Sequence, residues 1–171
     1  EQLVSATLRR NNFKKRDQVL TAQIAASHVE RDAYEANTFL LGGGLERQTN
    51  IIWQKKWTWS LGADLIATDE RDVDIDTGAT RRRTFFIGAV PASLSYDGSN
   101  DLLDPTTGFR LSGRISPEAS LQDGTFLYAR AQIDGTFYQP VSDRVVMAGR
   151  GRLGSIVGAP RDSIAPSRRF Y

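Results

Sequence analysis

The chain has 171 residues, with 22 Lys and Arg against 20 Asp and Glu and a formal net charge of +2. This charge is too small to indicate nucleic-acid binding, and the lack of cysteine excludes a disulfide-stapled secreted scaffold. No stretch approaches the roughly 18 apolar residues of a transmembrane helix. A hydrophobic content of 40% resembles a soluble protein, but membrane β-barrels share it because half of each strand faces a polar interior.

Eight segments alternate apolar with polar side chains, which is typical of β-strands whose two faces meet different environments. In chain order they are residues 4–9, 20–27, 39–45, 57–65, 86–96, 109–116, 127–137 and 145–157. Strands of about 9–11 residues can cross a bilayer at a tilt of roughly 45°. The pattern predicts an all-β fold, an antiparallel meander of about eight long strands.

The apolar faces of these segments are rich in Gly and Ala, which suits contact with lipid better than a packed protein core. Aromatic residues lie near the predicted strand ends, as in the interfacial girdles of membrane barrels. They are Tyr34, Trp53, Trp57, Trp59, Phe85, Phe86, Tyr96, Phe137 and Tyr138. Alternation alone does not show which face is inside, since a soluble sandwich points its apolar residues inward and a membrane barrel points them outward.

The polar faces collect charged residues that are candidates for lining a barrel lumen. They are Arg110, Arg114, Arg130, Arg150, Arg152, Asp64 and Asp134. In a soluble β-sandwich the same residues would form a solvated sheet face.

The connections offer little that indicates chemistry. Residues 69–83 form a predicted solvated loop, and its acidic spacing departs from a calcium-binding loop because glycine and glutamate are missing at the sixth and twelfth places. The glycines at 42–44 predict close packing or a bend in a strand. The single histidine, His28, has no cysteine or marked nucleophile beside it. We predict no enzymatic activity, no catalytic residue, no metal and no cofactor.

One stretch, residues 93–112, is more specific than the rest. Pro105 fixes φ and cannot donate to a ladder, and Gly108 permits an unusual dihedral before the next strand begins. The stretch resembles the strand–turn–strand signature of the bacterial surface antigen superfamily of outer-membrane assembly factors, which contains BamA and TamA. The residues that carry this turn motif are Tyr96, Asp97, Asp101, Asp104, Pro105, Thr106 and Gly108. Runs 42–47, 153–158 and 164–171 resemble the TamA branch.

The resemblance implies a transmembrane β-barrel of about sixteen strands, of which residues 1–171 would be a partial domain of central strands without POTRA domains or terminal seam strands. The chain would end just before the Val-Arg-Gly-Tyr motif of a long loop that folds into the lumen. Turn 97–108 would face the periplasm, and the connection at 69–83 would face outside.

The implied activity is the insertion, assembly or translocation of other outer-membrane proteins, without a cofactor, in the bacterial outer membrane. The implied partners are the lipid bilayer, unfolded outer-membrane client proteins and a periplasmic or inner-membrane assembly partner that binds missing domains. Nucleic acid is not among them. Two alternatives stay open from the residues alone: a self-contained eight-stranded barrel, in a membrane or carrying a ligand, and a soluble β-sandwich binding module.

Overall fold

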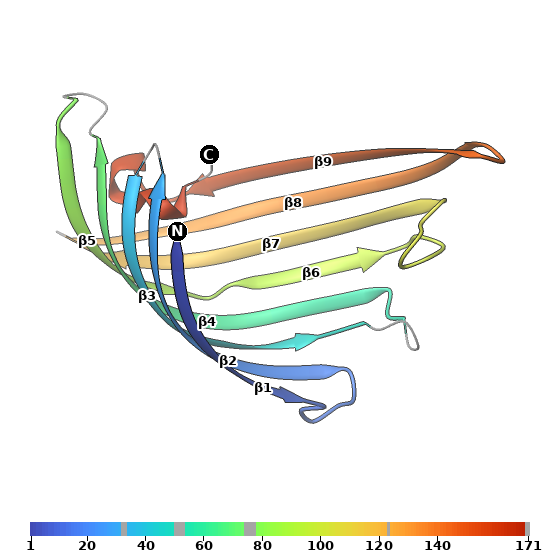
Figure 1. Ribbon diagram of the computed structural model, residues 1–171, viewed down its shortest axis with the longest axis horizontal. Coiled ribbons are helices and arrows are strands. Elements are labelled where there is room, and N and C mark those ends of the chain that lie inside the picture. The colour runs from blue at the N-terminus through green and yellow to red at the C-terminus, as the bar shows by residue number, and fades with distance from the viewer. Residues whose placement is uncertain (32–33, 50–53, 74–77, 123, 170–171) are drawn as a thin grey trace.

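A computed structural model describes residues 1–31, 34–49, 54–73, 78–122 and 124–169. The described residues form one strongly curved sheet with a short C-terminal tail lying inside the curve (Figure 1). The strands are β1 (Gln2–Asn11), β2 (Gln18–Arg31), β3 (Tyr34–Arg47), β4 (Trp57–Val73), β5 (Thr80–Ala89), β6 (Ala92–Asp97), β7 (Gly108–Leu121), β8 (Thr125–Ser142) and β9 (Val145–Val157). Two 3-10 turns, η1 (Arg161–Ser163) and η2 (Pro166–Arg168), lie in the tail.

The antiparallel meander is confirmed, with nine strands where eight were predicted. The sheet order is β1-β2-β3-β4-β5-β7-β8-β9, and β6 pairs with both β4 and β7. The fifth predicted segment, 86–96, is split between β5 and β6 at Val90 and Pro91. Pro91 cannot donate to the ladder, although its carbonyl oxygen accepts a 2.8 Å hydrogen bond from the Gly62 amide. The two strands therefore share one place in the sheet.

The prediction of a long loop over residues 69–83 is wrong. Strand β4 runs on to Val73 and β5 begins at Thr80, so only six residues connect them, and 74–77 lie outside the described residues. Two of the facing pairs across the ladder have opposite charges, Glu70 opposite Arg83 and Asp72 opposite Arg81, whereas Arg71 lies opposite Arg82, which forms its ion pair with Asp69. Opposite charges in register stabilise a strand pair.

Within each predicted segment, the register places the alternating apolar positions on the convex face and the mainly polar positions between them on the concave face. Large apolar side chains of the convex face are exposed, among them Leu65 (64%), Leu127 (67%) and Leu153 (77%). On the concave face, by contrast, Thr68 and Glu70 are each only 1% exposed. All nine strands in the described part of the chain belong to one sheet, so the second sheet that a sandwich requires is not among them.

The prediction of an aromatic girdle is correct for part of its residues. By strand alternation, the convex face holds Trp57, Trp59, Phe86, Tyr96 and Phe137. Tyr34, Phe85 and Tyr138 lie on the concave face, and Trp53 lies outside the described residues. Neighbouring residues in a strand point to opposite faces, so Phe85 and Phe86 cannot both belong to a girdle on the convex face.

Candidate functional site

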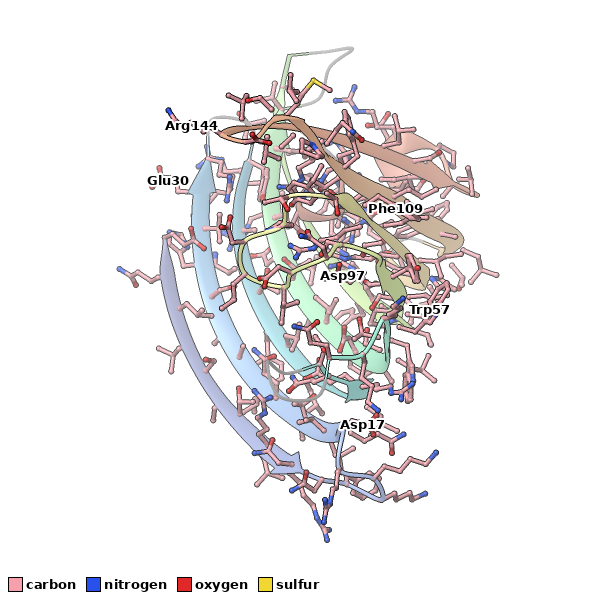
Figure 2. The ribbon with its side chains drawn as sticks, turned by 90° about the vertical axis from the view of Figure 1, so that its right-hand side faces the viewer. Asp17, Glu30, Trp57, Asp97, Phe109 and Arg144 are labelled. Atoms are coloured by element: carbon pink, nitrogen blue, oxygen red, sulfur yellow. The ribbon has the colours of Figure 1, made fainter. Side chains whose placement is uncertain are left out.

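The convex face carries a continuous apolar belt that ends in aromatic residues. At the end of the molecule that faces the viewer in Figure 2, Trp57 and Tyr96 make a tilted ring contact with centroids 4.9 Å apart, and Tyr96 contacts Phe109 with centroids 5.4 Å apart. Aromatic side chains with one apolar and one polar end favour the boundary between hydrocarbon and water. This row therefore marks one edge of the belt.

The height of the belt matches a membrane. On β4 the convex positions are apolar or small from Trp57 to Ala67, and on β8 from Leu127 to Phe137. Ten steps of about 3.3 Å, tilted by about 45°, span roughly 23 Å, close to the apolar band of about 25 Å in outer-membrane barrels. Among the described residues, no helix has the length and apolar character to span a bilayer.

All seven residues predicted to line a lumen lie on the concave face, in three groups. Asp134 on β8 accepts hydrogen bonds from Arg150 (3.2 Å) and Arg152 (2.6 Å) on β9. Arg110 forms an ion pair with Asp97 at 3.1 Å, and the other predicted residues lie near the middle of the wall.

The middle of the concave wall is hollow. A cavity of about 360 Å³ lies over β4, β6, β7 and β8, and one of about 200 Å³ over β2, β3 and β4 adjoins it. Both are lined by Ser60, Asp64 and Pro91. The larger one also meets Arg114 and Arg130. Small side chains and arginines make this part of the wall hydrated and open.

The tail, residues 161–169, folds back against the concave face and lies inside the curve of the sheet (Figure 1). Ala165 is fully buried in an apolar cluster with Ile66, Phe85 and Ile87. Ile164 is 3% exposed. This cluster of buried apolar residues lies inside the curve.

Three wall carboxylates hold the polar side of the tail. Glu118 accepts a bidentate hydrogen bond from Arg168, with the Nε contact at 3.0 Å. Glu70 accepts from the amide (2.9 Å) and hydroxyl of Ser167. Asp72 accepts from Arg81 at 3.0 Å, and Arg81 also donates to Asp162 of the tail at 2.8 Å.

The contacts between wall and tail were not predicted from the sequence, because Glu70 and Asp72 fell in the predicted solvated loop over residues 69–83. The only local signal was the charge of these residues. Their tail partners lie up to 97 residues away in the chain, so spacing along the sequence could not pair them.

The turn of the predicted motif, between β6 and β7, is built from its own side chains. A single Asp101 carboxylate oxygen accepts the amides of Leu103 (2.7 Å) and Asp104 (2.9 Å). These two amides hold the pKa of Asp101 below its usual range. The Asn100 side-chain oxygen accepts the amides of Thr106 (2.9 Å) and Thr107 (3.0 Å).

Arg110 ties this turn to the sheet. Its guanidinium donates to the carbonyl oxygens of Asp101 (3.0 Å) and Leu102 (2.9 Å) and pairs with Asp97.

Gly108 closes the turn with a φ of +99°. A Cβ atom there would lie 2.3 Å from the Gly98 carbonyl oxygen, so the position requires glycine. The motif residues Asp97, Asp101 and Gly108 thus have a structural role in the turn, and Pro105 follows Asp104 at its tip.

Metal chemistry finds no support in the described residues, where no three His, Cys, Asp or Glu side chains group as metal ligands. His28 lies on the convex face, with its Nδ1 2.9 Å from the Asn37 side-chain oxygen.

A sheet that curves around a charged concave wall and exposes an apolar belt outside is the wall of a transmembrane β-barrel. The chain belongs to the Omp85 superfamily, because the model of the Omp85 superfamily domain matches residues 1–171.

Among solved structures, the chain is similar to BamA from Haemophilus ducreyi lacking POTRA domains 1–3. The TM-score is 0.63 at 17% identity, over 92% of this chain and 33% of that one. At this identity the likeness concerns the fold alone, and the chain spans about a third of that structure. No curated protein matches the chain.

Proposed function

We propose that this chain forms part of the wall of an outer-membrane barrel that inserts, assembles or translocates other outer-membrane proteins. The observation that carries the proposal is the orientation of the faces, with apolar side chains on the convex side and a charged wall with a docked tail on the concave side. Membership of the Omp85 superfamily supports the same role. The proposed role is non-enzymatic and uses no cofactor, metal or nucleic acid.

We further propose that residues 1–171 are a partial barrel domain, completed by strands beyond β1 and β9 and by periplasmic POTRA domains. The share of the BamA structure that the chain covers, about a third, supports this division. The runs at 42–47 and 153–158 favour a TamA-like branch.

The proposed partners follow from the two faces. The apolar belt meets the lipid bilayer of the bacterial outer membrane, and the hydrated wall, with Arg114, Arg130 and Asp64, lines a lumen. Unfolded outer-membrane proteins are the clients, and a periplasmic or inner-membrane assembly partner binds through the other domains.

Two adjacent residues test the orientation of the faces in the full-length protein. Leu61 lies on the convex face and is 53% exposed, whereas Ser60 lines the concave cavities. Leu61→Arg places a charge in the belt and should cost about 2–4 kcal/mol of insertion free energy, whereas Ser60→Arg should insert normally. Heat-modifiable mobility of the membrane fraction measures insertion.

Client levels measure the activity in cells that depend on the variant. We expect Leu61→Arg cells to lose folded outer-membrane proteins together with the inserted variant. Equal insertion of both variants, or failure of Ser60→Arg alone, would contradict a lipid-facing convex side. Normal client levels in cells without any copy of the protein would contradict the assembly role itself.

A further inference from the structure

The convex face is hollowed where the apolar belt gives way to polar strand ends. A groove of about 490 Å³ crosses β1 to β5 at the end of the sheet where the tail also lies. Its outward-facing lining residues are Gln2, Val4, Ala26, His28, Asn37, Phe39, Ala67, Asp69, Thr84 and Phe86.

The sheet register sorts these residues into two rows. The apolar row reads Val4, Ala26, Phe39, Ala67 and Phe86 from β1 to β5, and the polar row beyond it reads Gln2, His28, Asn37, Asp69 and Thr84. In the apolar row small and large side chains alternate. The groove therefore consists of two pits, over Ala26 and Ala67, separated by the ring of Phe39.

The two pits are two strands apart, which is about 10 Å at an interstrand spacing of about 4.8 Å. A lipid with several acyl chains can place separate chains in the two pits. The apolar row thus favours a wide, multi-acyl lipid.

The polar row offers hydrogen-bonding groups across about 19 Å, four interstrand spacings. Its Asp69 carboxylate accepts from Arg82 Nε at 2.7 Å and from the Thr84 hydroxyl at 3.3 Å. Amide, imidazole, carboxylate and hydroxyl groups of this kind suit the hydroxyl and amide groups of a sugar headgroup.

The next row toward the strand ends is charged, and its sign changes across the sheet. Glu30 and Glu35 face each other on β2 and β3, and Arg71 and Arg82 face each other on β4 and β5. Guanidinium groups are the preferred protein partners of phosphate. A phosphate on the headgroup would therefore lie over the β4–β5 side, away from the two glutamates.

We propose that this groove binds a phosphorylated disaccharide lipid with several acyl chains, a glycolipid of the lipid A class. Acyl chains occupy the Ala26 and Ala67 pits, the sugar lies on the polar row, and a phosphate meets Arg71, because Arg82 is held by its ion pair with Asp69. The inference rests on the proposed membrane function, since only a lipid-facing convex side can present the groove to such a ligand.

The test uses the full-length protein purified in detergent, with diphosphoryl lipid A as the probe and native mass spectrometry as the readout. Ala67→Phe fills one pit, and Ala63→Phe makes the same change four residues along the same face of β4, outside the groove. We expect Ala67→Phe to weaken lipid A retention by about tenfold or more, and Ala63→Phe to bind like the wild type.

Headgroup recognition has its own pair of variants. Arg71→Gln should weaken binding of diphosphoryl lipid A, whereas Arg144→Gln, at the exposed β8–β9 turn, should not. Monophosphoryl lipid A, phosphatidylethanolamine and phosphatidylglycerol are expected to bind more weakly than the diphosphoryl form.

Equal retention of the phospholipids, or equal binding by the Ala67→Phe and Ala63→Phe variants, would overturn the proposed site. Heat-modifiable mobility of the same preparations distinguishes failure of the proposed lipid site from failure of the proposed membrane function. A folded, membrane-inserted protein without lipid A preference contradicts the lipid site alone, whereas failure of the wild-type protein to insert contradicts the proposed function as well.

Discussion

Asp101 organises the turn between β6 and β7 through one carboxylate oxygen, which accepts the amides of Leu103 and Asp104. These bonds require the ionised carboxylate and lower its pKa from the ordinary value of 3.8. Since the folded-state pKa is the lower one, the stabilisation is fully present above about pH 4 and is lost as the pH falls through the folded pKa. An NMR titration of this carboxyl group should show a midpoint below 3.8.

Two substitutions distinguish the titration of Asp101 from other effects of low pH on the turn. Asp101→Asn should abolish the pH dependence of the Leu103 and Asp104 amide signals, whereas Asp104→Asn, whose side chain lies at the exposed tip, should preserve it. An Asp101 midpoint at or above 3.8 would contradict the role of the two amides.

Glu118 and Arg168 join the wall to the tail. The Glu118 side chain is fully buried, and removing Arg168 leaves it only the more distant ion pair with Arg130 at 3.6 Å. We expect Arg168→Gln to loosen the tail by about 2 kcal/mol, the worth of a hydrogen bond to a charged group. Amide hydrogen exchange over residues 164–169 measures the loss of protection.

A double-mutant cycle tests whether the pair acts as a unit. The double variant with Glu118→Gln and Arg168→Gln should lose less protection than the sum of the two single changes. Arg144→Gln, at the exposed β8–β9 turn, serves as the control. Additive single effects would mean that Glu118 and Arg168 do not hold the tail as a pair.

Among the elements, β3 and β4 approach closely at their glycines, as the glycine run at 42–44 predicted. A Cβ atom on Gly44 would lie 2.9 Å from the Leu61 carbonyl oxygen, whereas one on Gly88 of β5 would meet nothing within 4 Å. We expect Gly44→Ala to destabilise the sheet by about 1–3 kcal/mol and Gly88→Ala to be tolerated. Urea unfolding of the detergent-solubilised protein gives the difference, and equal midpoints would contradict it.

Element existence was predictable from the sequence, but element ends were not. Period-two alternation is a local property, so seven of the eight predicted segments fall within single strands and the eighth, 86–96, is divided between β5 and β6. The ends of β4 and β5 depended on cross-strand ion pairs such as Asp72 with Arg81, and on the tail that covers Glu70. Arg81 and the tail residue Ser167 are too far along the chain from Asp72 and Glu70 for the alternation of neighbouring residues to reveal these contacts.

The break at Pro91 shows the same limit. The segment 86–96 alternates without interruption, but Pro91 lacks the donor that the ladder requires. The chain therefore leaves β5 and starts β6 two residues later, still beside β4 and β7. A proline within an alternating run was a visible signal that the prediction of a single strand did not use.

At the scale of the whole molecule, the described part of the sheet has two outer strands, β1 and β9, with no partner on their far side. It also exposes the apolar belt of the convex face. Unpaired edges and large apolar patches promote association in water. We predict that residues 1–171 alone self-associate in plain buffer and disperse in detergent, as analytical ultracentrifugation would show.

A compact monomer without detergent would contradict this prediction and, with it, the lipid-facing assignment for the isolated chain. Full-length protein in the same detergent provides the matched control, because neighbouring strands are expected to cover both edges.

The sequence by itself determined that the chain makes long antiparallel strands with one apolar and one charged face. Alternation and turn formation depend only on residues that are close together in the chain. Only the tertiary structure decided which face is convex, because period two is symmetric and curvature arises from the whole sheet. Only the tertiary structure brought Arg168 to Glu118 and Ser167 to Glu70, because contacts over 50 and 97 residues of separation follow from the path of the chain.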